Sequence, residues 1–212
     1  MQAISSSLGR MRGAVTRGAR ARVLTLAVLC ACVLPAGCGL GEADGSAPLT
    51  FTDNFRIIEN ERAYRSAQLD ATSFRLVIET YGIRTIINLR GENEDNLWYQ
   101  AERGIAAEMG VTLVDVRMSA NALPSRETLL LLYDTLTTAE HPILIHCKAG
   151  SDRTGAAAAI WRMAVNGESR AEARRELSPL YGHFRSATPE MDRLVAMFEP
   201  DRSWIENVYP EP

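Results

Sequence analysis

A short segment in the second half of the chain carries the residue types that chemistry on a phosphate group needs. It reads His146-Cys147-Lys148-Ala149-Gly150-Ser151-Asp152-Arg153-Thr154-Gly155. A cysteine thiolate is a strong nucleophile, and a nearby arginine or a helix N-terminus favours the thiolate over the thiol. The planar guanidinium of Arg153 can donate two parallel hydrogen bonds to phosphate oxygens. The segment therefore predicts a phosphate-binding loop that contains its own nucleophile.

The residues on either side of this segment predict a strand before it and a helix after it. Residues 142–145 are apolar, as in the middle of a sheet, and residues 156–165 have a helical pattern. In open α/β sheets, sites form at the carboxyl ends of strands, and a helix N-terminus directs N–H groups at a bound anion. Gly150 allows the backbone to curl closely. We therefore expect the amides of residues 148–153 to surround a phosphate.

The rest of the chain alternates between strand and helix patterns. Strands are predicted at residues 55–59, 63–66, 84–89, 111–116 and 142–145, and helices at about 71–81, 95–109, 124–139, 156–165, 169–180 and 189–198. This alternation predicts an α/β fold with a central, mostly parallel sheet of four to five strands flanked by helices. We place the domain at residues 51–200 and a C-terminal tail at residues 201–212.

The composition excludes several classes of protein. The chain has 212 residues, a net charge of -3 and 46% hydrophobic residues. This apolar fraction excludes a disordered chain, and the near-neutral charge gives no support to nucleic-acid binding. Four cysteines, three of them close together near the N-terminus, are too few and too clustered for a disulfide framework. Among the 23 basic residues, Lys148 is the only lysine.

The N-terminal residues have the pattern of an export signal. Residues 1–37 hold five arginines and no acid, which leaves the rest of the chain with a net charge of -8. The basic head precedes an apolar run and small residues before Cys38. The ending of this run resembles a bacterial lipoprotein box, with Pro35 where that pattern has a large apolar residue. We expect a signal/lipoprotein export segment at residues 1–38 and a flexible linker at 39–50.

Two alternatives for this N-terminal segment stay open, namely a cleaved signal without lipid and an uncleaved anchor at residues 23–40. Each of the three forms places the domain at the cell envelope or periplasm. In the lipoprotein form, an acylated Cys38 tethers the domain to a membrane, and Cys147 is the free thiol of the mature protein.

The phosphate-loop segment also carries a family resemblance. His-Cys, two residues, Gly, two residues, Arg and Thr is similar to the signature of the cysteine-dependent protein tyrosine and dual-specificity phosphatases. Three further segments resemble the bacterial atypical branch of these enzymes, and the similarity covers about residues 53–200. These segments are Asn54-Phe55, Tyr64-Arg65-Ser66-Ala67-Gln68 and residues 82–91. The resemblance implies a phosphomonoester hydrolase that needs no cofactor or metal.

The resemblance assigns a role to each matching residue. Cys147 would be the nucleophile, and Arg153 would bind the phosphate and its transition state. Thr154 would hydrogen-bond the sulfur, and His146 would lie behind the loop and tune the thiolate. The loop amides of Lys148, Ala149, Gly150, Ser151, Asp152 and Arg153 would bind the phosphate oxygens. The reaction would pass through a cysteinyl-phosphate that water then hydrolyses.

The general acid has two candidates, and the alternative that neither of them serves stays open. Asp152 lies inside the loop beside Arg153, and the resemblance to family members with Asp-Arg-Thr implies that it protonates the leaving oxygen. Asp115 lies 32 residues before Cys147, a spacing that suits the family, but it falls inside a predicted strand. The structural alternatives are a helix N-terminal cap for Asp152 and a salt bridge with Arg117 or Arg90 for Asp115.

Four other residues have a functional and a structural interpretation. Lys148 is expected to contact a second phosphate or an acidic head group, since the chain uses arginine everywhere else. Arg65 and Arg90 match family positions near the pocket, although either could instead hold a loop by hydrogen bonds. His183 is expected to be structural.

The leading hypothesis for function is therefore a phosphomonoester hydrolase whose substrate is a phosphoprotein, or a phospholipid or lipopolysaccharide phosphate at the cell envelope. The alternative is a catalytically inactive phosphate- or anion-binding lipoprotein of the envelope. A sulfurtransferase or an arsenate reductase is disfavoured. The first usually has a shorter loop between Cys and Arg, and the second usually needs a resolving cysteine.

Overall fold

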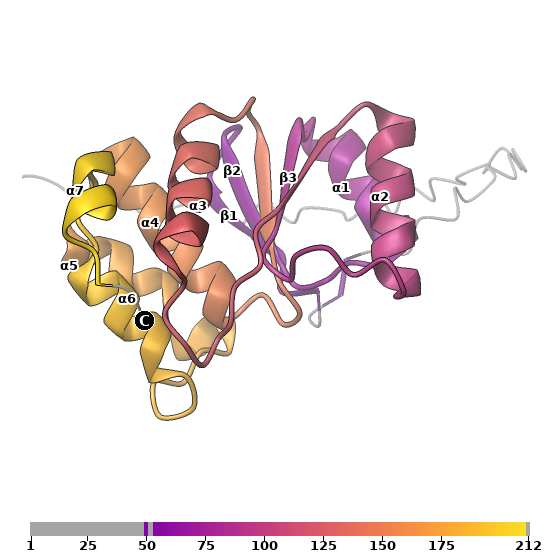
Figure 1. Cartoon of the computed structure of the whole chain (residues 1–212). Helices are drawn as coiled ribbons and strands as arrows, with labels where there is room; N and C mark the ends of the chain where they lie inside the picture. The colour runs from indigo at the N-terminus through magenta and orange to yellow at the C-terminus, as the bar shows by residue number, and fades with distance from the viewer. Residues whose placement is uncertain (1–48, 51–52, 211–212) are drawn as a thin grey trace, which may run out of the picture. The chain divides into compact units, whose positions relative to one another are not determined.

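The computed structural model describes residues 49–50 and 53–210 (Figure 1). The predicted export segment and almost all of the predicted linker lie outside the described residues, so those predictions stand as made. Within the described part of the chain, no helix is both long and apolar enough to cross a membrane.

The sheet has five strands and is mostly parallel, as predicted. In chain order the strands are β1 (Arg56–Glu59), β2 (Ala63–Ser66), β3 (Thr85–Asn88), β4 (Thr112–Asp115) and β5 (Ile143–His146). Their order across the sheet is β1-β2-β5-β3-β4. Only β1 runs antiparallel to its neighbour; the pairs β2–β5, β5–β3 and β3–β4 are parallel. The predicted apolar strand before the phosphate loop is thus the central strand.

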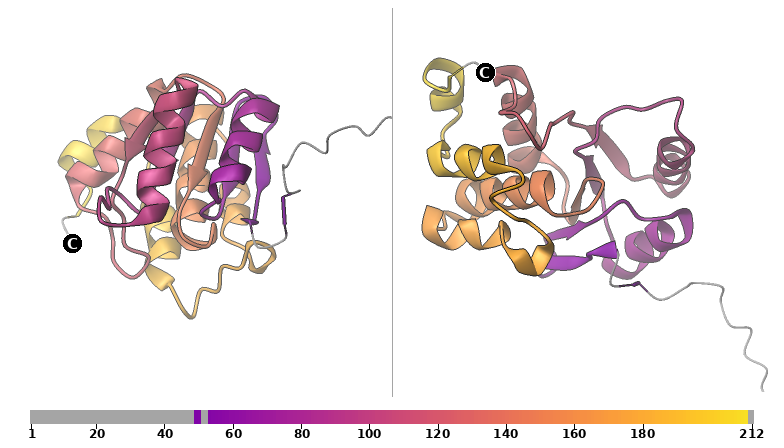
Figure 2. Two further views of the ribbon diagram at one scale, coloured as in Figure 1. Left: turned by 90° about the vertical axis from the view of Figure 1, so that its right-hand side faces the viewer. Right: turned by 90° about the horizontal axis from the view of Figure 1, so that it is seen from below.

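Helices cover both faces of the sheet (Figures 1 and 2). One face carries α1 (Ala71–Tyr81) and α2 (Leu97–Met109). The other face carries α3 (Arg126–Thr138), α4 (Asp152–Asn166), α5 (Arg170–Ala173), α6 (Pro189–Met197) and α7 (Arg202–Asn207). Two short 3-10 turns, η2 (Arg174–Glu176) and η3 (Pro179–Tyr181), join α5 to the later part of the chain.

Strand alternation divides the core between the two faces. Ile143 and Ile145 of β5 pack with α3 and α4, whereas Leu144 between them packs with α1 and α2. This follows from the two-residue side-chain period of a strand. Residues 156–159 of α4 are all alanines that are fully buried, so small side chains bring this helix close to the layers around it. The packing fixes the start of α4, and with it the end of the phosphate loop.

The ends of α1 agree with the predicted bounds because both caps are encoded locally. The Asp70 carboxylate accepts a hydrogen bond from the Ser73 backbone N–H at 2.7 Å, which caps the first turn. Gly82, with a φ of 62°, ends the helix in the left-handed conformation that glycine adopts readily.

Two regions differ from the sequence-based expectation. The single helix predicted at residues 169–180 is broken into α5, η2 and η3. Ser178 precedes Pro179 and has extended backbone angles, because a proline pushes the residue before it out of the helical conformation. The predicted tail from residue 201 on instead forms α7, which packs against α3 and buries Ile205. Tyr209, two residues beyond the helix, is also buried.

Candidate active site

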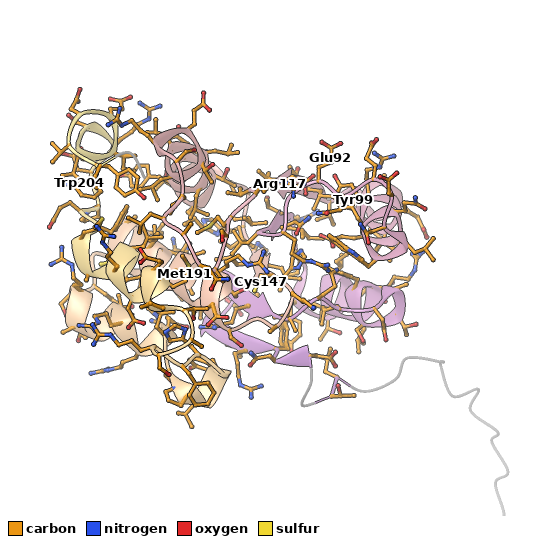
Figure 3. The ribbon with its side chains drawn as sticks, turned by 60° about the horizontal axis from the view of Figure 1, so that its bottom comes forward. Glu92, Tyr99, Arg117, Cys147, Met191 and Trp204 are labelled. Atoms are coloured by element: carbon orange, nitrogen blue, oxygen red, sulfur yellow. The ribbon has the colours of Figure 1, made fainter. Side chains whose placement is uncertain are left out.

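The carboxyl ends of four strands lie level at one edge of the sheet. His146, the last residue of β5, pairs in register with Ser66 of β2 and Asn88 of β3, and Asn88 pairs with Asp115 of β4. Cys147 therefore leaves the sheet at the middle of this row. Figure 3 shows Cys147 between Met191 in one helical layer and Tyr99 in the other.

The loop from Cys147 to α4 is held from outside through its carbonyl groups. The Lys148 carbonyl accepts from the Gln68 N–H at 3.2 Å, and the Ala149 carbonyl accepts from the Asn54 side-chain amide at 3.0 Å. The Gly150 carbonyl accepts from the Arg65 guanidinium at 2.7 Å. In a trans peptide the C=O and the following N–H point in opposite directions. The amides that follow these carbonyls therefore face the inside of the loop, as a phosphate cradle requires.

Gly150 is required at its position for two independent reasons. Its φ of 70° lies in the left-handed region, and a Cβ built there would lie 2.7 Å from the backbone of Ser66 and Ala67. The phosphate loop thus packs its backbone directly against the end of β2.

Arg65 is fully buried and contacts the loop through the Gly150 carbonyl. Besides Gly150, its guanidinium binds the Glu176 carboxylate at 2.6 Å and the Glu176 carbonyl at 2.9 Å. Burial lowers the pKa of Arg65, and the charge of Glu176 opposes that shift. The structure therefore favours the structural interpretation of Arg65: it holds the loop by hydrogen bonds.

Arg153 reaches from the first turn of α4 to the ends of the parallel strands. Its guanidinium donates to the Leu89 carbonyl at 3.2 Å and to the Met118 carbonyl at 3.3 Å. The pKa of Arg90 is lowered by burial and by the nearby positive charge of Arg153. Arg90 also stacks over the ring of Trp98 at 3.4 Å and donates to Gln68 at 2.8 Å. Two cationic side chains therefore lie close together near the loop, as an anion site requires.

His146 lies behind the loop in a buried polar chain. Its Nε2 is 2.8 Å from a carboxylate oxygen of Glu102, and both side chains are fully buried. The other Glu102 oxygen accepts from the Gln68 amide at 2.8 Å, and Gln68 accepts in turn from Arg90. This chain connects the residue before Cys147 to a cationic side chain near the loop.

Cys147 itself is 2% exposed and forms no disulfide. Thr154 is fully buried, and its hydroxyl has no hydrogen-bond partner among the described residues. The expected bond from Thr154 to the sulfur is therefore not formed in this structure, and that role stays a prediction.

Asp115 is the last residue of β4, and its carboxylate is held by two neutral donors. Its carboxylate accepts from the Asn88 amide at 2.7 Å and from the Tyr99 hydroxyl at 2.5 Å. Burial and the hydrogen bond to Asp115 raise the pKa of Tyr99. The backbones of Asp115 and His146 are two strands apart, or about 10 Å at a spacing of roughly 4.8 Å per strand. The structural alternative of a salt bridge to Arg117 or Arg90 is therefore wrong in its partners, because Asp115 binds these two neutral donors instead.

Asp152 begins α4 and lies on the loop side of the site. It does not cap the helix: Ser151 is the N-cap residue, and the Asp152 carboxylate instead contacts His183 and Thr188, each at 2.7 Å. Its side chain is 26% exposed. Of the two candidate acids, the structure therefore favours Asp152 by position, and its role stays a prediction.

A cavity of about 400 Å³ adjoins the loop. Its lining includes Ala149 and Ser151 from the loop and Pro179, Leu180 and Tyr181 from η3. The Leu180 side chain is 84% exposed, and Lys148 next to Cys147 is also exposed. The surface beside the phosphate loop thus combines apolar groups with a cation.

Sequence reasoning did not single out Glu102, Glu176 or Asp192 as site residues. Glu102 is buried in α2 between Tyr99 and Ile105, so it is an acid inside the apolar stripe of a helix. Such a residue requires a buried partner, and this signal was present in the sequence. The partner of each acid comes from a distant segment, which spacing along the chain does not reveal.

Together, the central-strand cysteine, the inward amides and Arg153 define the site of a cysteine-dependent phosphatase. A family model described as PTP-NADK, a DSP-PTPase phosphatase fused to NAD+ kinase, matches residues 50–191. The chain therefore belongs to this family of dual-specificity and tyrosine phosphatases. Within the described residues, no group of three or more His, Cys, Asp or Glu side chains is placed to hold a metal ion.

Known proteins agree with this assignment. The chain is 30% identical over 116 residues to the dual specificity protein phosphatase TpbA of Pseudomonas aeruginosa (strain UCBPP-PA14), a match that covers 54% of this chain and 49% of TpbA. The chain thus spans about half the length of this curated relative.

Solved structures share the fold. A crystal structure of P. aeruginosa TpbA matches with a TM-score of 0.58 and 23% identity, over 75% of this chain and 94% of that one. The catalytic core of the PP-IP phosphatase Siw14 from S. cerevisiae, in complex with citrate, matches with a TM-score of 0.57 and 25% identity, over 73% of this chain and 92% of that one.

Proposed function

We propose that the protein hydrolyses phosphomonoesters through a cysteinyl-phosphate, and that its natural substrates are phosphorylated lipids or lipopolysaccharide head groups at the cell envelope. The observation that carries the proposal is the loop geometry. Successive loop carbonyls are tied to the surrounding protein, so the intervening amides face a common centre beside Cys147 and Arg153. Preorganised donors of this kind stabilise the charge of a phosphoryl transition state without reorganisation.

The reaction has two steps. The Cys147 thiolate attacks phosphorus, the ester P–O bond breaks, and the acid gives a proton to the leaving oxygen. Water then attacks phosphorus, the S–P bond breaks with its electron pair returning to sulfur, and the proton from water returns to the acid. Arg153 and the loop amides bind the three phosphoryl oxygens throughout.

Three features support a lipid or lipopolysaccharide substrate. Lys148 is exposed next to Cys147 and can contact a second anionic group. The cavity beside the loop is lined partly by apolar side chains, of which Leu180 is highly exposed. The export pattern of residues 1–38 favours an envelope location, with a lipid tether at Cys38.

The test compares turnover of lipid phosphates in mixed micelles with turnover of phosphotyrosine peptides, because a variant of TpbA has been crystallised with phosphotyrosine. We expect a higher kcat/KM for the lipid phosphates. The variant Lys148→Gln should lower turnover of substrates with two anionic groups more than turnover of a simple aryl phosphate. A clear preference for the peptides would contradict the proposed substrate class and leave the phosphatase assignment intact.

No observation favours the inactive, anion-binding alternative. Both the nucleophile and the phosphate-binding arginine are present on a preformed loop. Turnover that Cys147→Ser abolishes, with binding of a phosphate analogue retained, would exclude it directly.

A further inference from the structure

Three titratable side chains lie in a line beside the phosphate loop. Nδ1 of His183 is 2.7 Å from Oδ1 of Asp152, and Nε2 of the same ring is 2.8 Å from Oδ2 of Asp192. His183 is 2% exposed and Asp192 is 7% exposed. The residues come from α4, from the segment between η3 and α6, and from α6, so only the tertiary fold brings them together.

The two contacts hold the His183 ring from both sides. Both ring nitrogens of His183 face carboxylate oxygens, which only accept hydrogen bonds when ionised. The two contacts together fix the orientation of the ring between the two aspartates.

The contacts fix one oxygen of Asp152 and leave the other available. The Thr188 hydroxyl donates to Oδ1 at 2.7 Å, the same oxygen that His183 contacts. Among the described residues, Oδ2 of Asp152 makes no hydrogen bond. On the far side of the ring, Arg174 and Arg185 each lie 3.9 Å from Asp192 and offset its charge. The carboxyl group next to Arg153 is thus oriented by buried neighbours and keeps one oxygen for exchange.

We propose that His183 is a positioning residue for ester cleavage: it holds Asp152 by one oxygen, so that the other exchanges a proton with the leaving oxygen and then with water. Asp192 anchors the far side of the ring. This inference rests on the proposed function. His183 neither gains nor loses a proton, so phosphoryl transfer to Cys147 and hydrolysis of the intermediate proceed as written above.

The first experiment compares leaving groups. Phenyl phosphate has a leaving oxygen that needs a proton, whereas dinitrophenyl phosphate does not. We expect His183→Asn to lower kcat for phenyl phosphate by about 100-fold, the low end for a lost acid, with kcat for dinitrophenyl phosphate within roughly 3-fold and KM for both nearly unchanged. A purely structural role would slow both substrates equally.

Three further variants separate position from folding. Asp192→Asn keeps the side-chain volume and should change kcat in the same direction by a smaller factor. The double variant Asp152→Asn/His183→Asn should be no slower on phenyl phosphate than Asp152→Asn alone, because His183 acts through Asp152. Ser186→Ala, at an exposed position in the same segment, is the control and should behave as wild type.

The outcomes distinguish the two proposals. If the wild-type protein turned over neither phenyl phosphate nor dinitrophenyl phosphate, the proposed function and the role of His183 would both be overturned. Wild-type turnover combined with equal losses on both substrates, or with multiplying losses in the double variant, would overturn the role of His183 alone. Nitrogen NMR of the wild-type protein gives a reading that does not depend on variants. The proposal requires a hydrogen-bonded proton between Nδ1 of His183 and Asp152, and an Nδ1 that makes no hydrogen bond would overturn it.

Discussion

At the residue scale, buried polar side chains hold the site in place. His146, Glu102 and Arg65 are all essentially without solvent contact, and each is paired at hydrogen-bond distance. When one partner of a buried pair is removed, the other stays buried without a hydrogen-bond partner. The cost of its desolvation is then larger than the net stabilisation that the pair provided. The residues behind the loop should therefore be as sensitive to substitution as those that face the substrate.

Glu102→Gln tests this sensitivity. The amide would keep one oxygen and replace the other with an NH₂ group, so either the His146 contact or the Gln68 contact would lose its acceptor. We expect a loss of about 1–3 kcal/mol in the free energy of unfolding, measured by urea denaturation, together with a lower kcat. The control is Glu108→Gln on the same helix, an exposed side chain paired with Arg75. A similar loss in both variants would contradict the role given to the buried chain.

The placement of Cys147 and Arg153 in one loop could be predicted from sequence because their spacing along the chain is short. The supporting residues could not, because the partner of each comes from a distant segment. Glu176 lies 111 positions from Arg65, and Asp152 lies 31 positions from His183. The expectation that His183 is structural and the expectation that Asp152 is an acid were made separately, and the structure joins them in one contact.

At the element scale, the phosphate loop depends on the close approach of its backbone to the end of β2. Gly150→Ala should distort the loop, because a Cβ there would meet backbone atoms at 2.7 Å. We expect turnover to be lost and the protein to be destabilised by more than the roughly 1–2 kcal/mol that a left-handed alanine costs.

The matched control for this change is Gly167→Ala. Gly167 has a φ of 67°, close to that of Gly150, but a Cβ there would meet nothing within 4 Å. This variant should keep full turnover and lose only the backbone cost, about 1–2 kcal/mol in chemical denaturation. Equal losses of turnover and stability in the two variants would show that the close approach of Gly150 to the end of β2 is unimportant.

Elements were predictable where their end signals are local. Residues 71–81 lie between an N-cap aspartate, Asp70, and a terminal glycine, Gly82, and the predicted bounds agree with the structure. The prediction of one helix at 169–180 was wrong because apolar spacing continues through Pro179, while the backbone before a proline does not stay helical.

At the scale of the whole molecule, the C-terminal segment belongs to the core. Tyr209 is fully buried and donates through its hydroxyl to the Pro124 carbonyl at 2.8 Å. Its neighbour Trp204 packs against both Tyr209 and Phe198. The domain therefore extends beyond residue 200, where the sequence pattern was interpreted as a tail.

Tyr209→Ala should lower the free energy of unfolding by about 3–5 kcal/mol, the usual cost of removing a large buried aromatic side chain. Val208→Ala, at a residue that is 64% exposed, is the control and should stay within about 0.5 kcal/mol of wild type. Equal stabilities of the two variants in thermal or urea unfolding would mean that the segment does not contribute to the core.

The most direct test of the central claim is detection of the covalent intermediate. The protein would be mixed with dinitrophenyl phosphate, quenched in acid within milliseconds, and examined by intact-mass and peptide mass spectrometry. We expect one added phosphoryl group, on the peptide that contains Cys147, and none in Cys147→Ser. Turnover that continues in Cys147→Ser, or a phosphoryl group on any other residue, would contradict it.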